Sequence, residues 1–157
     1  MLQETQLATQ VITWGLIVVG WVTVHYLTLT RERQKEIREL KSKLVERILE
    51  IENRSIAFHQ ASGHNQDEAR SLVAEIERVS SAIARKPLSV LAIKPRAVTQ
   101  FRRSITLKNF DQSAFNTQSA NSRLLNDISL RTEGLTDALE EAYANRYLHA
   151  WWQAFRV

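Results

Sequence analysis

A long stretch without charge near the N-terminus constrains the fold of this chain more than any other feature. Residues 5–30 contain no Asp, Glu, Lys or Arg, and Arg31 is the first of several bases that follow. The centre of the stretch, residues 11–29, is apolar. Because a hydrocarbon core of ~30 Å requires about 20 helical residues, the stretch is long enough to cross a membrane once. We therefore predict a transmembrane helix at residues 11–30, preceded by a short extracytosolic tail at residues 1–10.

Two other interpretations of this stretch are weaker. A cleaved signal peptide begins with basic residues and ends at a small-residue cleavage site, whereas this N-terminus holds an acid and no base. A buried helix of a soluble domain is usually shorter and lacks interface markers. Here aromatic residues lie near both ends of the stretch, where amphipathic rings favour the headgroup layer. The predicted membrane-interface residues at this end of the chain are Trp14, Tyr26, Arg31, Arg33 and Lys35.

The distribution of bases predicts the orientation of the span. Residues 31–47 contain seven Lys and Arg residues, whereas the residues before the span contain none. Because Lys and Arg stay on the cytosolic side, we expect the N-terminus outside and residues 31–157 in the cytosol. The absence of cysteine suits a reducing compartment. We expect the inner (plasma) membrane as the location.

The cytosolic part has the composition of helices. Apolar residues recur every three or four positions from Ile37 to Phe58, which is typical of one helical face. Residues 21–62 contain no Gly or Pro, so the transmembrane helix is predicted to continue into the cytosol. The predicted fold class is all-α, with one N-terminal transmembrane helix continuous with a cytosolic antiparallel helical bundle. A long homomeric coiled coil is the alternative. We expect cytosolic helices at about 31–61, 67–85, 96–106 and 112–156.

Small and hydroxyl residues within the span indicate helix contacts. Thr13, Gly20 and Thr23 lie roughly on one face, and small residues let transmembrane helices approach closely. They are the predicted oligomerisation residues, although an isolated span tolerates them equally well. His25 lies one turn from the cytosolic end, which favours the headgroup region over a proton relay.

Bases without acids mark a second region of interest, from Arg78 to Phe110. A basic surface on a membrane protein attracts anionic lipid, and a solvated face or contacts with acidic protein groups are the alternatives. Nucleic acid is disfavoured, because the region lacks a reader motif and its only aromatic residues are Phe101 and Phe110. The predicted basic patch comprises Arg85, Lys86, Lys94, Arg96, Arg102, Arg103 and Lys108.

Two apolar segments each have two interpretations. The segment between Pro87 and Pro95 is too short to span a membrane, so it is either an irregular core connection or a membrane-surface contact. The C-terminal residues include aromatic side chains at i,i+4 spacing, which form either a bundle core or an anchor in the headgroup layer. Four alternating helices would return the chain to the membrane side. Trp151, Trp152 and Phe155 therefore complete the predicted membrane-interface residues.

No motif indicates catalysis, a cofactor or a metal. Thiol chemistry is excluded because the chain has no cysteine, and His59, His64, Asp67 and Glu68 match no zinc spacing. Phosphate-binding loops are also absent from the sequence. We expect a membrane-anchored interaction or scaffold protein, not an enzyme, that forms a homo-oligomer and recruits or regulates a cytosolic protein partner. The alternative is a membrane-acting effector, such as a toxin, phage-defence protein or pore-forming subunit, whose transmembrane helices oligomerise to disrupt the bilayer.

Overall fold

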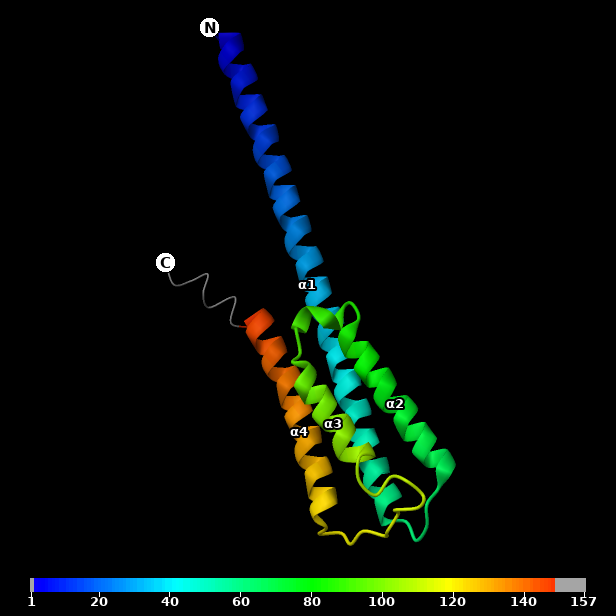
Figure 1. The fold of residues 1–157 in the computed structure, drawn as a ribbon. Coiled ribbons are helices and arrows are strands. Elements are labelled where there is room, and N and C mark those ends of the chain that lie inside the picture. The colour runs from blue at the N-terminus through cyan, green and yellow to red at the C-terminus, as the bar shows by residue number, and fades with distance from the viewer. Residues whose placement is uncertain (1, 149–157) are drawn as a thin grey trace. The chain divides into compact units, whose positions relative to one another are not determined.

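The computed structural model describes residues 2–148, without the side chains of residues 2–9, 11, 12 and 148. All regular structure within this range is helical, which confirms the all-α prediction. A 3-10 turn, η1 (Leu88–Leu91), and a short π-helical segment, η2 (Ala144–Leu148), accompany four α-helices (Figure 1). The α-helices are α1 (Leu2–Gln60), α2 (Gln66–Ala84), α3 (Pro95–Thr106) and α4 (Arg123–Tyr143).

The chain divides into two compact units, which we call unit 1 (Met1–Ile37) and unit 2 (Arg38–Val157). Helix α1 contributes to both and is uninterrupted from Leu2 to Gln60. Residues 2–10, within the predicted extracytosolic tail, are helical as well, because no Pro or Gly stops the helix there. Among the described residues, α1 is the one helix long and apolar enough to cross a membrane, and its apolar window is not buried by the rest of the protein.

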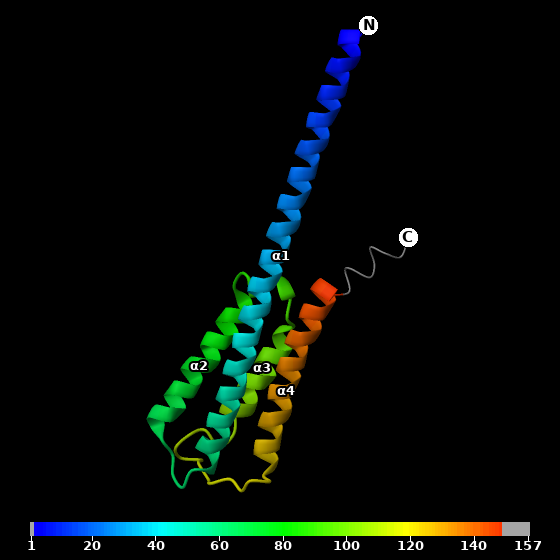
Figure 2. The same ribbon diagram turned by 180° about the vertical axis from the view of Figure 1, so that it is seen from behind.

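Unit 2 has an apolar helical core. The apolar stripe of α1 continues into it, with Ile48 and Ile51 at 0% and 1% exposure. Each fully buried side chain of this size stabilises the fold by about 1.5–3 kcal/mol. Figure 2 shows that α2, α3 and α4 lie beside this part of α1. They bury Leu72, Ile76 and Val79 from α2, Phe101 and Ile105 from α3, and Ile128, Leu135 and Leu139 from α4.

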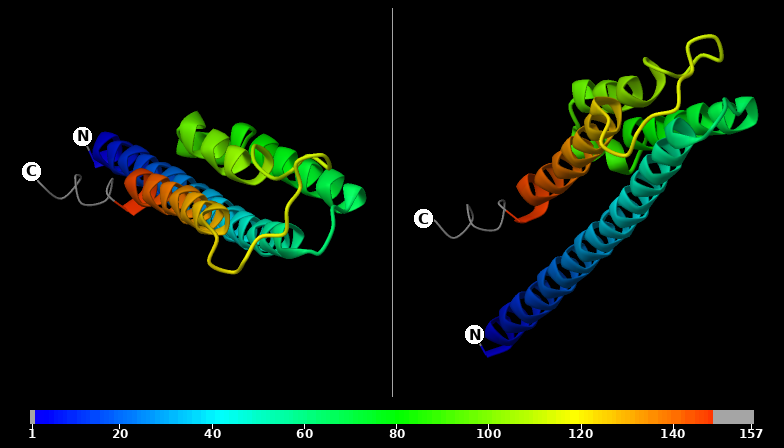
Figure 3. Two further views of the ribbon diagram at one scale, coloured as in Figure 1. Left: turned by 60° about the horizontal axis from the view of Figure 1, so that its bottom comes forward. Right: turned by 90° about the horizontal axis from the view of Figure 1, so that it is seen from below.

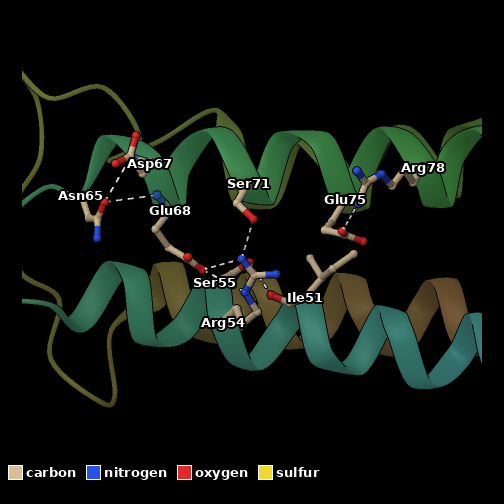
Figure 4. A network of polar contacts seen from close by, with 9 residues as sticks. All are labelled: Ile51, Arg54, Ser55, Asn65, Asp67, Glu68, Ser71, Glu75 and Arg78. Carbon is tan, nitrogen blue, oxygen red and sulfur yellow. Dashed lines mark hydrogen bonds and ion pairs between the residues drawn. The ribbon is translucent and has the colours of Figure 1, made fainter.

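A polar network joins the last turns of α1 to the first turns of α2. The Arg54 guanidinium lies 2.9 Å from the Glu68 carboxylate and donates a hydrogen bond of 2.8 Å to Ser71 Oγ (Figure 4). The hydrogen bond that the Arg54 guanidinium donates to the Glu68 carboxylate is the main cause of a raised pKa at Arg54. Asn65 caps α2 by accepting hydrogen bonds from the backbone N–H groups of Asp67 and Glu68. The cap and the ion pair together fix the turn between the two helices.

The C-terminal end of α4 lies beside the first turns of α1 in unit 2. Lys41 is 7% exposed and forms an ion pair with Glu140, and its ammonium lies 4.9 Å from the centre of the Tyr143 ring. These contacts satisfy a nearly buried cation, which would otherwise be costly. We call this the Lys41 end of unit 2.

The last helix begins later than the sequence predicted. The expected start was about residue 112, but α4 begins at Arg123, after an irregular segment at residues 107–122. The side chain of Ser122 accepts a hydrogen bond from the Leu125 N–H and caps the helix there. The segment before it passes beside the end of α1 (Figure 3). Its long-range hydrogen bonds to that end compete with a helical conformation. Beyond η2 the predicted helix lies outside the described residues.

Candidate functional site

The residues predicted to act in the membrane lie on the open surface of unit 1. Trp14 and Tyr26 are 67% and 70% exposed. Thr23 donates a hydrogen bond of 2.8 Å to the Val19 carbonyl, so its hydroxyl is satisfied within the helix. A methyl group added at Gly20 would meet nothing within 4 Å, so this face is open. The remaining members of the two predicted sets in this unit, Thr13, Arg31, Arg33 and Lys35, are exposed as well.

The C-terminal members of the predicted interface, Trp151, Trp152 and Phe155, lie outside the described residues. The start of the same aromatic series is described. Tyr143 and Tyr147 have ring centres 5.1 Å apart at the Lys41 end.

The predicted basic patch is divided between several parts of unit 2, and all seven members are exposed. Arg85 and Lys86 follow the end of α2, and the Arg102 guanidinium lies 3.7 Å from the Glu77 carboxylate. Lys94 and Arg96 line a cavity of about 600 Å³ near the Lys41 end, together with Arg146. Arg103 and Lys108 belong to a separate groove between α3 and α4.

This α3–α4 groove has a volume of about 850 Å³ and gathers four bases. Its only acid is Asp127, whose carboxylate lies 3.3 Å from the Arg131 guanidinium. The other three bases form no ion pair with any residue that the structure describes. They are Arg103, Lys108 and Arg123.

Apolar and amide side chains complete the groove. Leu107 and Leu130 are 61% and 60% exposed and give the groove apolar surface. Gln100, Gln118 and Asn126 supply groups that can both donate and accept hydrogen bonds. The groove can therefore hold an extended or helical segment that carries negative and apolar side chains.

Sequence reasoning missed the contribution of α4 to this groove. Arg123 and Arg131 lie beyond the acid-free region that defined the predicted patch, so they were not included in it. Their spacing of eight residues places them within about 80° of each other on the helix. That spacing could have indicated that Arg123 and Arg131 lie on one face of α4. Only the packing of α3 against α4 shows that they lie near Arg103.

A buried histidine fixes the segment that forms one end of the groove. His59 is 0% exposed, and its Nδ1 accepts a hydrogen bond of 3.2 Å from the Asn109 side-chain amide. Asn109 has a φ of 55°, a left-handed conformation that asparagine tolerates well. The side-chain oxygen of Asn109, Oδ1, accepts a hydrogen bond from the backbone N–H of Asn116, which sets the orientation of the Asn109 amide. Backbone N–H of Gln118 donates to the His59 carbonyl at 2.8 Å.

Burial lowers the pKa of His59, and the nearby backbone groups of Ile105 and Asn109 only partly oppose this effect. Neither makes a hydrogen bond of good geometry with Nε2, which has no partner among the described residues. With Nδ1 accepting from Asn109, the neutral ring carries its proton on Nε2. A second proton on Nδ1 would face the amide N–H of Asn109, so His59 holds this segment in its neutral form.

Aromatic packing surrounds this histidine. The Phe58 ring lies 5.1 Å from His59, 5.5 Å from His64 and 5.5 Å from Phe115, measured between ring centres. His64 Nε2 lies 2.9 Å from the Phe110 carbonyl oxygen. Both imidazoles thus take part in packing, and the described residues contain no group of three or more metal-type ligands.

The chain matches no protein-family model, no curated protein and no solved structure.

Proposed function

We propose that this protein is a single-pass, membrane-anchored interaction or scaffold protein that recruits or regulates a cytosolic protein partner. The exposed apolar surface of unit 1 carries the proposal. The window of α1 that is long and apolar enough to span a membrane has no buried residue. Such a surface is costly in water and is favourable in lipid.

Antiparallel packing of the helices in unit 2 is part of this proposal. Two ion pairs support it for α1 and α2, since Arg54 pairs with Glu68 and the earlier Arg47 lies 3.5 Å from the later Glu75. The pair of Lys41 with Glu140 supports the same arrangement for α1 and the end of α4. An assembly of this kind leaves one end free for a partner and one end joined to the span by the chain.

The proposed orientation, N-terminus outside and unit 2 in the cytosol of a cell with an inner membrane, rests on the bases after residue 30. Single-cysteine variants test it, because the chain has no native cysteine. A membrane-impermeant maleimide should label Gln6→Cys in spheroplasts and Lys43→Cys only after lysis. The reverse pattern would contradict the orientation, and recovery of the protein in the soluble fraction would contradict the anchor.

Self-association through Thr13, Gly20 and Thr23 is proposed for the span. Gly20→Leu should weaken it, because the larger side chain separates helices that small residues bring together. Gly15→Leu is the matched control, since a methyl group added at either glycine meets nothing within the monomer. Crosslinking in native membranes should show less dimer for Gly20→Leu only. A monomer in all three proteins would refute the idea.

Contact of exposed bases with anionic lipid is proposed for the Lys41 end, where Lys94, Arg96 and Arg146 share a cavity. The effector alternative predicts a different outcome on expression. Induced cells loaded with a membrane-potential dye should keep their potential if the protein is a scaffold. Rapid depolarisation, abolished by Gly20→Leu, would favour a membrane-disrupting assembly instead.

A further inference from the structure

We propose that the α3–α4 groove binds an acidic segment of a cytosolic partner, with leucine-like side chains placed between its carboxylates. This inference rests on the proposed function and names the chemistry of the partner. It starts from the charge of the groove, in which three of four bases have no ion pair among the described residues. An occupant with several carboxylates would supply the missing counter-charges.

The bases come from two helices and the segment between them. Arg103 lies in the last turn of α3, Lys108 follows it, and Arg123 opens α4. All three side chains are exposed, so a partner can reach them without displacing the core. Arg131 is oriented by Asp127 and by Gln100, whose Oε1 lies 3.4 Å from the Arg131 guanidinium.

Because two exposed leucines line the groove, an acidic protein segment fits it better than other anionic ligands. Leu107 and Leu130 offer apolar surface beside the bases, which favours side chains such as leucine on the occupant. Single-stranded nucleic acid is usually held by aromatic platforms, and no aromatic residue lines this groove. Amide groups of Gln100, Gln118 and Asn126 can pair with peptide groups of an extended segment.

Hydrogen bonds to the end of α1 fix one wall of the groove. Gln118 lines it and donates its backbone N–H to the His59 carbonyl at 2.8 Å. Lys108 precedes Asn109, whose amide is fixed by His59 and Asn116. A preformed wall lowers the ordering cost of binding.

The bases of this groove lie in a different part of unit 2 from the bases of the cavity at the Lys41 end. His59 lies eighteen residues along α1 from Lys41, which corresponds to about 27 Å. The groove therefore extends toward the end of unit 2 opposite the Lys41 end, and Gln100 lies where it adjoins the cavity at the Lys41 end. Lys94, Arg96 and Arg146 form the separate cavity at the Lys41 end.

The experiment measures binding of a labelled synthetic peptide, in which pairs of glutamates alternate with single leucines, to the full chain in zwitterionic nanodiscs. We expect saturable binding that weakens as salt rises from about 0.1 M to about 1 M, because the screening length falls from about 10 Å to about 3 Å. Replacing every glutamate by glutamine should abolish binding. Replacing every leucine by serine should weaken it.

Charge reversal in the groove provides the matched comparison. Arg103→Glu with Arg123→Glu should weaken binding by about tenfold or more, equivalent to about 1.4 kcal/mol. Lys43→Glu with Arg38→Glu changes the charge equally on exposed positions outside the groove and should leave binding unchanged. A peptide with lysine in place of glutamate should bind the reversed groove better than the native one. Arg103→Gln with Arg123→Gln provides a milder variant if the reversed protein unfolds.

Several results would overturn the inference. They include equal weakening by the two double variants, no binding by the native protein, or displacement of the peptide by soluble phosphatidylserine without any effect of the groove variants. Preferential, groove-dependent binding of polyuridylate RNA would assign the groove to nucleic acid. Crosslinks from Arg103→Cys to a second copy, unaffected by the peptide, would assign it to self-association. Failure of a correctly inserted protein to bind the peptide contradicts this inference alone, whereas failure to insert contradicts the proposed function.

Discussion

The two parts of α1 carry apolar side chains in opposite surroundings. In unit 1, Trp21 and Val24 are 67% and 65% exposed, whereas in unit 2 Ile48 and Phe58 are 0% and 3% exposed. One continuous helix thus changes from an open apolar surface to a core helix without a break. The difference shows that apolar content alone does not distinguish an exposed segment of a helix from a core segment. The charged face opposite the stripe, present only after residue 30, does distinguish them.

The largest expected effect is loss of core packing in unit 2. Phe101→Ala removes a fully buried ring and should lower the free energy of unfolding by about 3–5 kcal/mol. Trp21→Ala removes a larger side chain from unit 1 and should leave the unfolding of unit 2 unchanged, because the ring is exposed. Urea unfolding in mild detergent, followed by circular dichroism, measures both. Equal destabilisation would show that the two units do not differ in this way.

The next effect concerns membrane insertion. Val18→Arg with Val22→Arg places two charges in the open apolar surface of α1, at a cost of about 2.5–3.5 kcal/mol each at the centre of a bilayer. The variant should shift from the membrane to the soluble fraction on carbonate extraction. Leu49→Arg is the matched change at an exposed apolar residue of unit 2, 44% exposed, and should remain in the membrane. Retention of the double variant would argue against a span.

A smaller effect is the pH dependence of unit 2. The pKa of His59 is lowered in the folded protein, so the unfolded chain binds a proton first as pH falls below about 6.5. Stability is therefore complete above that pH and decreases below it, by at most about 1.4 kcal/mol per pH unit for this group. Urea unfolding across this range should show the loss. His59→Gln should flatten the curve, and an unchanged slope would exclude His59 as its source.

The smallest effect is expected at the surface of unit 2. Arg54→Met breaks the ion pair with Glu68, in which the two side chains are 31% and 33% exposed. Because water partly screens this half-buried pair, the cost, including the lost hydrogen bond to Ser71, should be about 1 kcal/mol. Lys43→Met, at an exposed base without an ion pair among the described residues, should cost nothing measurable. Thermal unfolding compares the two, and a loss as large as that of Phe101→Ala would contradict this ranking.

Local patterns in the sequence were enough to predict the helical class. The absence of Gly and Pro across residues 21–62 indicated that α1 continues past the predicted span, and the spacing from Ile37 to Phe58 indicated its buried face. The start of α4 was predicted wrongly. The predicted start near residue 112 lies beside Asp111 and Ser113, which are residue types that cap helices, but Ser122 is the residue that caps α4. Capping residues are common in loops, so tertiary contacts decide which one is used.

The candidate site was less accessible to sequence reasoning. Arg103 and Lys108 were recognised as part of a basic region, but their partners Arg123 and Arg131 lie on another helix. The burial of His59 was not predicted from the sequence, and its hydrogen bond to Asn109 joins residues 50 positions apart. Contacts between residues so distant in sequence depend on how the helices pack against one another. The loop sequence has no periodic pattern from which this packing could be predicted.

The hydrogen bonds between residues 107–122 and the end of α1 bear on the order in which unit 2 folds. Thr117 Oγ1 donates to the Ala61 carbonyl at 2.9 Å across 56 positions, and Gln118 reaches the His59 carbonyl beside it. These bonds close a long loop, whose entropy cost is met only when α2 and α3 are already in place. We therefore expect the carbonyl groups in the last turn of α1 to stay exposed to water until late in folding. The residues that satisfy these carbonyl groups lie in a loop distant in sequence, and the rest of unit 2 must fold before that loop reaches the end of α1.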